Sequence, residues 1–226
     1  HILLTRPLED CSEMILKFKD LGHNISHLPL LEIEALKYEK INLFDFKAIV
    51  FTSANAIKFL NTKNFDKNLI CFCVGNATEK KARSTGFQNV YAADGNVSNL
   101  KEIILQNFNS SDGKILYVSG ELLSSDLDKQ LIHTGYNLKR VINYKTNHNI
   151  KFDEKFVEQL KMNIPDIVYI YSQNSALSFL NFIKNYRSES LWMNTNLMCI
   201  GEKTSSILNE IKWKKIFLFN PGEEEF

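Results

Sequence analysis

The chain has almost no surplus of either charge. Its 226 residues include 27 Lys and Arg against 26 Asp and Glu, which gives a formal net charge of +1 at pH 7. Basic and acidic residues are interleaved, so we expect neither nucleic acid nor an anionic membrane as a partner. No apolar run approaches the roughly 20 residues needed to span a bilayer. Ile2–Leu4 is too short for a signal sequence, which predicts a cytoplasmic protein.

Common cofactor and catalytic motifs are also missing. The sequence contains no GxGxxG, Walker-type lysine loop, GxSxG or HExxH pattern. Its five histidines are scattered, and none lies at zinc-ligand spacing from the four cysteines. Cys71 and Cys73 share one face of an apolar strand, which favours core packing over redox chemistry. We therefore predict no metal and no cofactor.

What the chain does contain is a regular alternation of strand and helix signals. Fully apolar runs indicate strands buried on both faces, as in parallel sheets built from βαβ units. Gly22, Gly86 and Gly135 suit helix C-caps. Strands are predicted over residues 2–5, 48–52, 70–74, 115–118, 137–146, 167–170, 197–200 and 216–219. Helices are predicted over 8–21, 53–60, 76–86, 97–108, 123–134, 152–161, 175–183 and 204–210.

Two extended segments suggest where the chain passes between domains. One surrounds Pro29, and the other begins near Asn143 and is polar without a helical period. We predict two similar α/β domains, with helix-flanked parallel sheets of flavodoxin-like type, joined by a two-stranded linker. The expected division is a discontinuous domain over 1–32 plus 148–226, an inserted domain over 37–143, and linkers near 33–36 and 144–147.

A short sequence motif occurs twice. The first copy is Val74-Gly75-Asn76-Ala77-Thr78, and the second is Ile200-Gly201-Glu202-Lys203-Thr204. A second motif also occurs twice, with Phe51–Ala56 upstream of the first copy and Tyr171–Ala176 upstream of the second. The duplication predicts similar domains that face a shared cleft.

These motifs lie after a strand and before a helix, which is where open α/β sheets bind ligands. Helix N-termini carry unpaired N–H groups and a partial positive charge, which suit anions. Asn76 and Glu79 also have the spacing of a capping box. The candidate binding residues are Ser53, Asn76, Thr78, Ser172, Lys203 and Thr204. Helix capping for the hydroxyl and amide side chains, and an exposed surface position for Lys203, are the alternatives.

Two further side chains are candidates on position alone. Arg6 follows the first strand and can hold a carboxylate through two hydrogen bonds, or can simply be solvated. Tyr144 ends the strand that enters the second linker, so its neutral phenol would point toward the cleft as a proton donor. An aromatic plug between the domains is the alternative for Tyr144.

With these motifs taken together, the chain resembles the uroporphyrinogen-III synthase family. The resemblance spans nearly the whole chain and includes Ile2–Pro7, Phe51–Ala56, Val74–Thr78 with Gly86-Phe87, Tyr144–Thr146, and Ser172 with Gly201–Thr204. It implies a cofactor-free cyclisation of hydroxymethylbilane, a linear tetrapyrrole with eight carboxylates, to uroporphyrinogen III with inversion of the last ring. It also implies a catalytic role for Tyr144 and hand-over from the preceding pathway enzyme. The sequence shows no long surplus amphipathic helix that would predict a dimer, so we expect a monomer.

The sequence departs from the family in three places. Residues 117–121 lack an arginine that often precedes Gly120, so a substrate contact there is in doubt. The second turn has Glu202-Lys203 where Pro-Thr is common. The chain stops at 222–226, where relatives usually continue into a last helix, which suggests a trimmed end.

Two other classes of protein would show similar patterns. A non-catalytic two-domain protein that closes on a small anion would share the hinge and the helix-terminus donors. A flavodoxin-like or receiver-type signalling domain is the third interpretation, which the duplicated halves and the missing acidic cluster disfavour.

Overall fold

The computed structural model describes residues 1–63, 65–66, 68–94 and 97–220. The chain forms two compact units, one combining His1–Glu32 with Asn147–Phe226 and the other comprising Ile33–Thr146. The C-terminal segment 222–226, expected to be a trimmed end, lies outside the described residues. The predicted domain and linker boundaries remain a prediction.

The first unit is built on a five-stranded parallel sheet with strand order β11-β10-β9-β1-β2. Counted along the chain, this is the 2-1-3-4-5 order of doubly wound folds. The strands are β1 (Ile2–Leu4), β2 (Ile25–His27), β9 (Ile167–Ile170), β10 (Asn196–Ile200) and β11 (Lys215–Phe219). The helices are α1 (Leu8–Asp20), α6 (Glu154–Met162), α7 (Gln173–Asn185) and α8 (Glu202–Ser205), with 3-10 turns η2 (Glu189–Asn194) and η3 (Ser206–Leu208).

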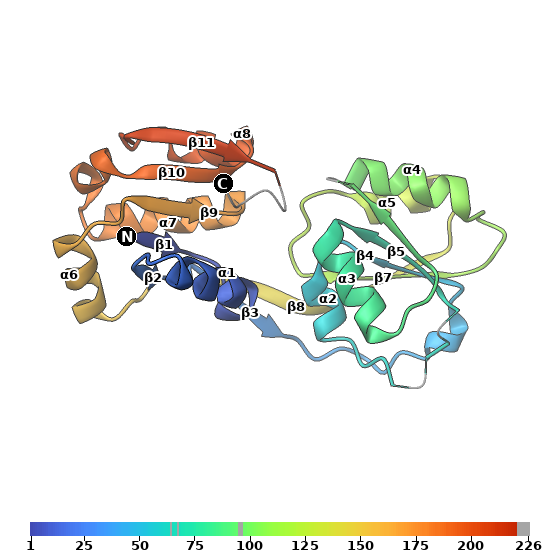
Figure 1. The fold of residues 1–226 in the computed structure, drawn as a ribbon. Helices are drawn as coiled ribbons and strands as arrows, with labels where there is room; N and C mark the ends of the chain where they lie inside the picture. Colours follow the sequence, from blue (N-terminus) through green and yellow to red (C-terminus); the bar gives the residue numbers. More distant parts are fainter. Residues whose placement is uncertain (64, 67, 95–96, 221–226) are drawn as a thin grey trace. The chain divides into compact units, whose positions relative to one another are not determined.

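Side chains that alternate along these strands fill two cores, because successive residues of a strand point to opposite faces. Leu3 and Val168 pack with residues of α6 and α7 on one face. Ile2 and Leu4 pack with Phe18 of α1 on the other. Helices therefore cover both faces of the sheet, as the fully apolar strands require (Figure 1).

The second unit is built on a six-stranded sheet with order β3-β8-β7-β4-β5-β6. The pairs from β8 to β6 are parallel. Its strands are β3 (Leu31–Ala35), β4 (Ala48–Phe51), β5 (Ile70–Val74), β6 (Val90–Ala93), β7 (Ile115–Gly120) and β8 (Leu138–His148). Its helices are α2 (Ala54–Lys58), α3 (Asn76–Thr85), α4 (Val97–Asn107) and α5 (Leu127–His133), with the turn η1 (Leu43–Asp45). The predicted pair of parallel α/β domains is thereby confirmed.

Both faces of this sheet are also covered. Ile49 and Phe51 pack with residues of α2 and α3, whereas Val50 and Phe72 pack with residues of α4 and α5. The segments expected as linkers, 33–36 and 144–147, fall largely within β3 and β8, which are neighbours at the edge of the sheet.

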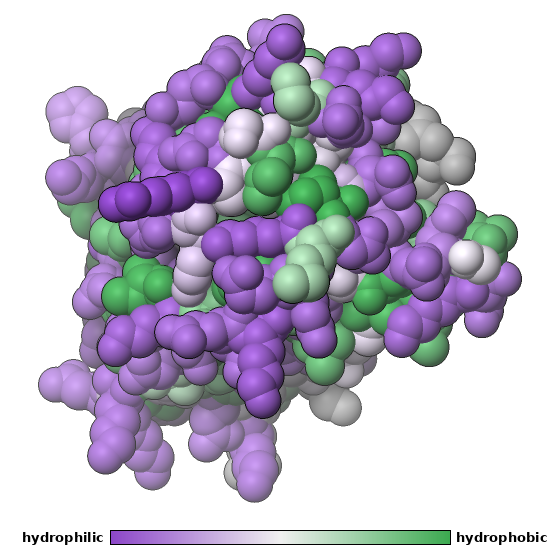
Figure 2. All heavy atoms as spheres, turned by 90° about the vertical axis from the view of Figure 1, so that its left-hand side faces the viewer, coloured by the Kyte–Doolittle hydropathy of each residue, from purple (hydrophilic) through white to green (hydrophobic). Residues whose placement is uncertain are grey.

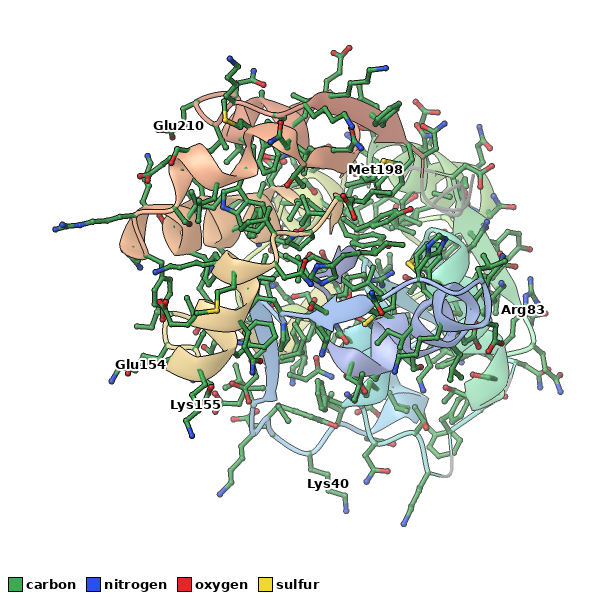
Figure 3. The ribbon with its side chains drawn as sticks, turned by 60° about the vertical axis from the view of Figure 1, so that its left-hand side comes forward. Lys40, Arg83, Glu154, Lys155, Met198 and Glu210 are labelled. Atoms are coloured by element: carbon green, nitrogen blue, oxygen red, sulfur yellow. The ribbon has the colours of Figure 1, made fainter. Side chains whose placement is uncertain are left out.

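Several helix boundaries follow from local sequence. The Ser53 hydroxyl accepts a hydrogen bond from Asn55 N at 3.2 Å and begins α2, as predicted. Gly86 ends α3 in the left-handed conformation, with φ of 111°. The expected capping box is wrong, because Gly75 is the N-cap and Asn76 is already helical. Glu79 instead pairs with Arg83 at 2.8 Å, and Figure 3 shows Arg83 at the outer surface.

The remaining differences from the sequence-based elements are short. Helix α5 begins at Leu127 rather than at residue 123, and the expected helix over 204–210 is α8 followed by η3. Strands β2, β3 and β6 were not predicted as strands, and β3 overlaps the segment that was expected to be a linker.

The face in Figure 2 is dominated by hydrophilic side chains, with small apolar areas between them. On α6, Glu154 and Lys155 extend outward (Figure 3). Within the described ranges, no helix combines the length and apolar character that crossing a membrane would need.

Candidate active site

Each sheet has one point where the strand order reverses, and ligands of open α/β folds bind there at the carboxyl ends of the strands. In the first unit this switch point lies between β1 and β9. In the second it lies between β4 and β7. Arg6 and Ser172 follow β1 and β9, and Ser53 follows β4. Sequence reasoning therefore placed three candidates at switch points, each within its own unit.

At the switch point of the first unit, the Arg6 side chain is about one-third exposed and already has partners. Its Nη2 lies 3.7 Å from Asp10 Oδ2, and its guanidinium carbon lies 4.8 Å from the centre of the Tyr171 ring. Thr5, which is buried, donates from Oγ1 to the Tyr169 carbonyl at 2.6 Å and ties β1 to β9. Arg6 is thus oriented by packing while keeping part of its guanidinium in solvent.

The two serine turns are capped by their own side chains. Ser172 Oγ accepts from Ser175 N at 3.0 Å, and Ser175 Oγ accepts from Ser172 N at 2.9 Å, which completes a capping box. Ser53 caps α2 in a simpler way. The capping alternative considered for these serines is therefore present in the structure.

The two glycine turns have the same backbone geometry. Gly75 has φ 77° and ψ 154°, and Gly201 has φ 71° and ψ 164°, a region that only glycine adopts without strain. A glycine N-cap has no side chain with which to satisfy the first N–H groups of its helix. The N-termini of α3 and α8 therefore have no side-chain cap, whereas those of α2 and α7 are capped by serine.

Side chains in the glycine turns divide into exposed and buried ones. Asn76 and Lys203 are exposed, in the first turns of α3 and α8. Thr78 and Thr204 are buried, with exposed fractions of 5% and 4%. The two threonines occupy the same position in each duplicated turn, and both are buried.

Tyr144 lies near the switch point of the second unit because of an irregularity in β8. Ser119 pairs with Ile142 but Gly120 pairs with Tyr144, so Asn143 forms a bulge. The Tyr144 ring is partly buried against the core cluster beneath α2, with its centre 6.5 Å from that of Phe59. Among the described residues, its hydroxyl has no hydrogen-bond partner, which leaves the donor open to a ligand.

Arg140 is a site residue that sequence reasoning missed. From β8, its Nε donates to Ser119 Oγ at 2.9 Å, and its Nη2 donates to the carbonyls of Gly120 at 2.8 Å and Glu121 at 3.0 Å. Its Nη1 lies 3.9 Å from Asp128 Oδ2. A guanidinium therefore occupies the turn after β7, where residues 117–121 carry no arginine. Because Arg140 belongs to the neighbouring strand β8, the sequence of residues 117–121 does not indicate it.

A second polar pair at this switch point is fully internal. The Tyr117 hydroxyl lies 3.1 Å from Thr52 Oγ1 and bridges β7 and β4. Burial raises the pKa of Tyr117 above its ordinary value, although the Thr52 hydrogen bond and the nearby Arg140 charge oppose this. Tyr117 is 1% exposed, so it stays neutral and structural while Tyr144 remains accessible.

The cysteines and the possible metal ligands add no further site. Cys71, Cys73 and Cys199 are fully buried, and burial raises the pKa of each thiol. In the part of the chain that the structure describes, no group of three His, Cys, Asp or Glu side chains could hold a metal ion.

Comparison with known proteins identifies the family of the chain. A family model described as uroporphyrinogen-III synthase HemD matches residues 12–218. The porphyrin biosynthesis protein HemD of Ruminiclostridium josui is 23% identical over 218 residues, covering 90% of this chain. The chain spans 42% of the length of that curated relative.

Two solved structures share the fold. Uroporphyrinogen-III synthetase from Helicobacter pylori 26695 is 20% identical, with a TM-score of 0.66, over 96% of this chain and 91% of that one. A mutant uroporphyrinogen III synthase from Thermus thermophilus is 12% identical, with a TM-score of 0.54, over 95% and 91%. Since the family model covers most of its length, the chain belongs to the uroporphyrinogen-III synthase (HemD) family.

Proposed function

We propose that this chain cyclises hydroxymethylbilane to uroporphyrinogen III, with inversion of the terminal ring, in tetrapyrrole biosynthesis. The observation that carries the proposal is the family match over residues 12–218. The accessible phenol of Tyr144 beside a switch point supports it, because this chemistry needs a proton donor and a bent substrate rather than a cofactor.

The first step is loss of the terminal hydroxyl of the bilane. The carbon–oxygen bond breaks as the adjacent pyrrole nitrogen supplies electrons, its N–H proton is released, and the hydroxyl leaves as water. In this proposal the Tyr144 O–H donates a hydrogen bond to the departing oxygen. The resulting azafulvene is attacked by the substituted carbon of the last ring, and the spiro intermediate fragments and recloses with that ring inverted.

The remaining site residues bind carboxylates in this proposal. Arg6 offers its partly exposed guanidinium, and Lys203 offers its ammonium. The turns at Gly75, with Asn76, and at Gly201 offer backbone N–H groups. Several weak donors suit a flexible polyacid better than one strongly basic pocket, in keeping with the net charge of +1.

Four of the candidate side chains have a weaker claim to direct contact. Ser53 and Ser172 already cap helices, and Thr78 and Thr204 are buried. In this proposal these four residues hold the turns that face the ligand, and they contact the substrate after small side-chain movements. Action as a monomer, cytoplasmic location and hand-over of the bilane from the preceding enzyme are further parts of the same proposal.

The product isomer tests the function. Hydroxymethylbilane made enzymically is incubated with the full chain, and the oxidised porphyrins are separated by chromatography. Free bilane closes without inversion, so an excess of the type III isomer over a protein-free control is expected. Type I product alone would reject the synthase and leave the non-catalytic anion-binding protein as the remaining interpretation.

A further inference from the structure

We propose that Gly120 is the positioning residue for Tyr144: its missing side chain creates the space that the phenol occupies. The effect on catalysis rests on the proposed function. The position of the Tyr144 ring follows from the contacts of Gly120 alone.

The contact is unusually close. A Cβ atom built on Gly120 would lie 2.7 Å from Tyr144 Cζ, 2.8 Å from Cε2 and 3.0 Å from the hydroxyl oxygen. Non-bonded carbon atoms attract best at about 3.5–4.0 Å, so any side chain at this position overlaps the ring. The atoms that would be displaced are those at the hydroxyl end of the phenol.

Backbone conformation does not explain the glycine. Six other glycines have positive φ angles of 71° to 138°, whereas Gly120 is not among them. Alanine is therefore compatible with the backbone at this position. The need for glycine comes from the tyrosine ring packed against it.

The surrounding structure prevents the backbone from relieving the overlap. The Tyr144 carbonyl accepts from Glu121 N at 2.9 Å, which fixes β8 against the end of β7. Asn143, which is fully buried, donates from Nδ2 to the Ala56 carbonyl at 2.7 Å and anchors the bulge. Arg140 holds the carbonyls of Gly120 and Glu121. With both strands held, the Tyr144 side chain must rotate, and its hydroxyl moves away from the switch point.

The test is Gly120→Ala in the full chain, compared with Tyr144→Phe and with the double variant. A displacement of about 1 Å at a reacting group can lower turnover by about 100-fold, and we expect Gly120→Ala to lose at least about tenfold in kcat with little change in KM. The double variant is expected to have the same kcat as Tyr144→Phe alone, because displacing a ring that has no hydroxyl removes no further interaction with the substrate. Fully multiplicative losses would overturn the assignment.

Gly113→Ala is the matched control. A Cβ at Gly113 would lie 2.6 Å from Lys47 Cγ, and its φ is 138°, so this variant is also crowded and strained. Gly113 precedes the N-terminal end of β7, whereas Gly120 ends that strand beside Tyr144. We expect it to lower the melting temperature and leave kcat unchanged. Equal loss of kcat in Gly113→Ala and Gly120→Ala would show a general stability effect and reject the positioning role.

A readout independent of activity separates this inference from the proposed function. In protein with ¹³C-labelled tyrosine rings, the Tyr144 signal is assigned by its absence in Tyr144→Phe. Gly120→Ala should shift that signal, and an unchanged signal would overturn the inference even if the wild-type chain is a synthase. If Gly120→Ala is too unstable to label, combining it with Tyr144→Ala should recover its melting temperature relative to Gly120→Ala alone, and no recovery would count equally against it.

Discussion

Tyr144→Phe removes one hydroxyl and leaves the packing of the ring intact. In the described part of the chain that hydroxyl has no hydrogen-bond partner, and the ring keeps its contacts with Phe59 and with the core beneath α2. Substitutions that remove no buried interaction change stability by less than about 0.5 kcal/mol. Any large loss of turnover in Tyr144→Phe is therefore a loss of chemistry and not of fold.

The size of that loss follows from the role proposed for the phenol. A positioned proton donor contributes about 10²–10⁴-fold to a rate, and a neutral phenol that donates without fully transferring its proton belongs at the lower end. We expect kcat to fall about 100-fold, which corresponds to about 2.7 kcal/mol of transition-state stabilisation. Turnover should not vanish, because holding the bilane in a bent conformation can supply about 7 kcal/mol by itself.

The assay measures type III porphyrin formation at saturating bilane, together with product binding by titration. The matched control is Tyr136→Phe, which removes a buried phenol that donates to the Phe108 carbonyl at 2.6 Å in the same unit. We expect Tyr136→Phe to lose about 1–3 kcal/mol of stability, since a buried carbonyl loses its donor, while keeping its kcat. Wild-type kcat in Tyr144→Phe, or an equal loss in both variants, would refute the assignment.

Three further outcomes are expected. Asn143→Ala should lose about 1–3 kcal/mol of unfolding free energy in urea titrations, because it leaves the buried Ala56 carbonyl without its donor. Burial raises the pKa of Cys73 and of Cys199 to about 12 from an ordinary 9.0, so the folded chain binds protons that the unfolded chain releases. The contribution of these thiols to the free energy of unfolding should be complete below pH 9 and should fall between pH 9 and 12. The fall is up to about 1.4 kcal/mol per pH unit for each thiol. Cys73→Ala should make this decline with pH less steep. A fragment of residues 33–146 should fold on its own with a cooperative urea transition, whereas a fragment of residues 1–112 should not.

Local patterns in the sequence predicted the fold well where several residues act together. The fully apolar run Ala48–Phe51 is a central strand because helices cover both of its faces, and such a run has few other uses. Gly75 and Gly201 were identified by their repetition, and their shared φ and ψ explain why glycine recurs there. Asn76 shows the limit, since its spacing from Glu79 suited a capping box but the helix begins one residue earlier.

Non-local contacts account for what sequence reasoning missed at the site. Arg140 reaches the turn after β7 from a position 20 residues away from Gly120, and nothing in residues 117–121 indicates its arrival. The bulge at Asn143 depends on hydrogen bonds to Ala56 and Leu36, which lie far from it in the sequence. Such contacts are set by how strands pair, which single-sequence periodicity does not encode.

The order of the strands shows why each switch point needs both halves of the sequence. β1 and β2 are followed 113 residues later by β7 and β8, counting from Ile2 to Ile115 and from Ile25 to Leu138. Those two pairs occupy the same places in their sheets, and the central strands β9 and β4 also correspond. Apart from β3, which is an additional edge strand of the second sheet, the sequence therefore consists of two consecutive five-strand repeats, β1-β2-β4-β5-β6 and β7-β8-β9-β10-β11, that exchange their last three strands.

This exchange places one strand from each repeat on either side of both switch points. β1 of the first repeat adjoins β9 of the second, which brings Arg6 next to Tyr171. β4 of the first repeat adjoins β7 of the second, which joins Thr52 to Tyr117. A fragment of residues 1–112 holds β1 and β4 without either partner strand, so it retains no switch point and leaves two apolar strand edges unpaired. Residues 33–146 keep the parallel strands of their sheet with both flanking layers of helices, and the Tyr144–Gly120 contact should therefore persist in that fragment even though it has lost every strand of the first unit.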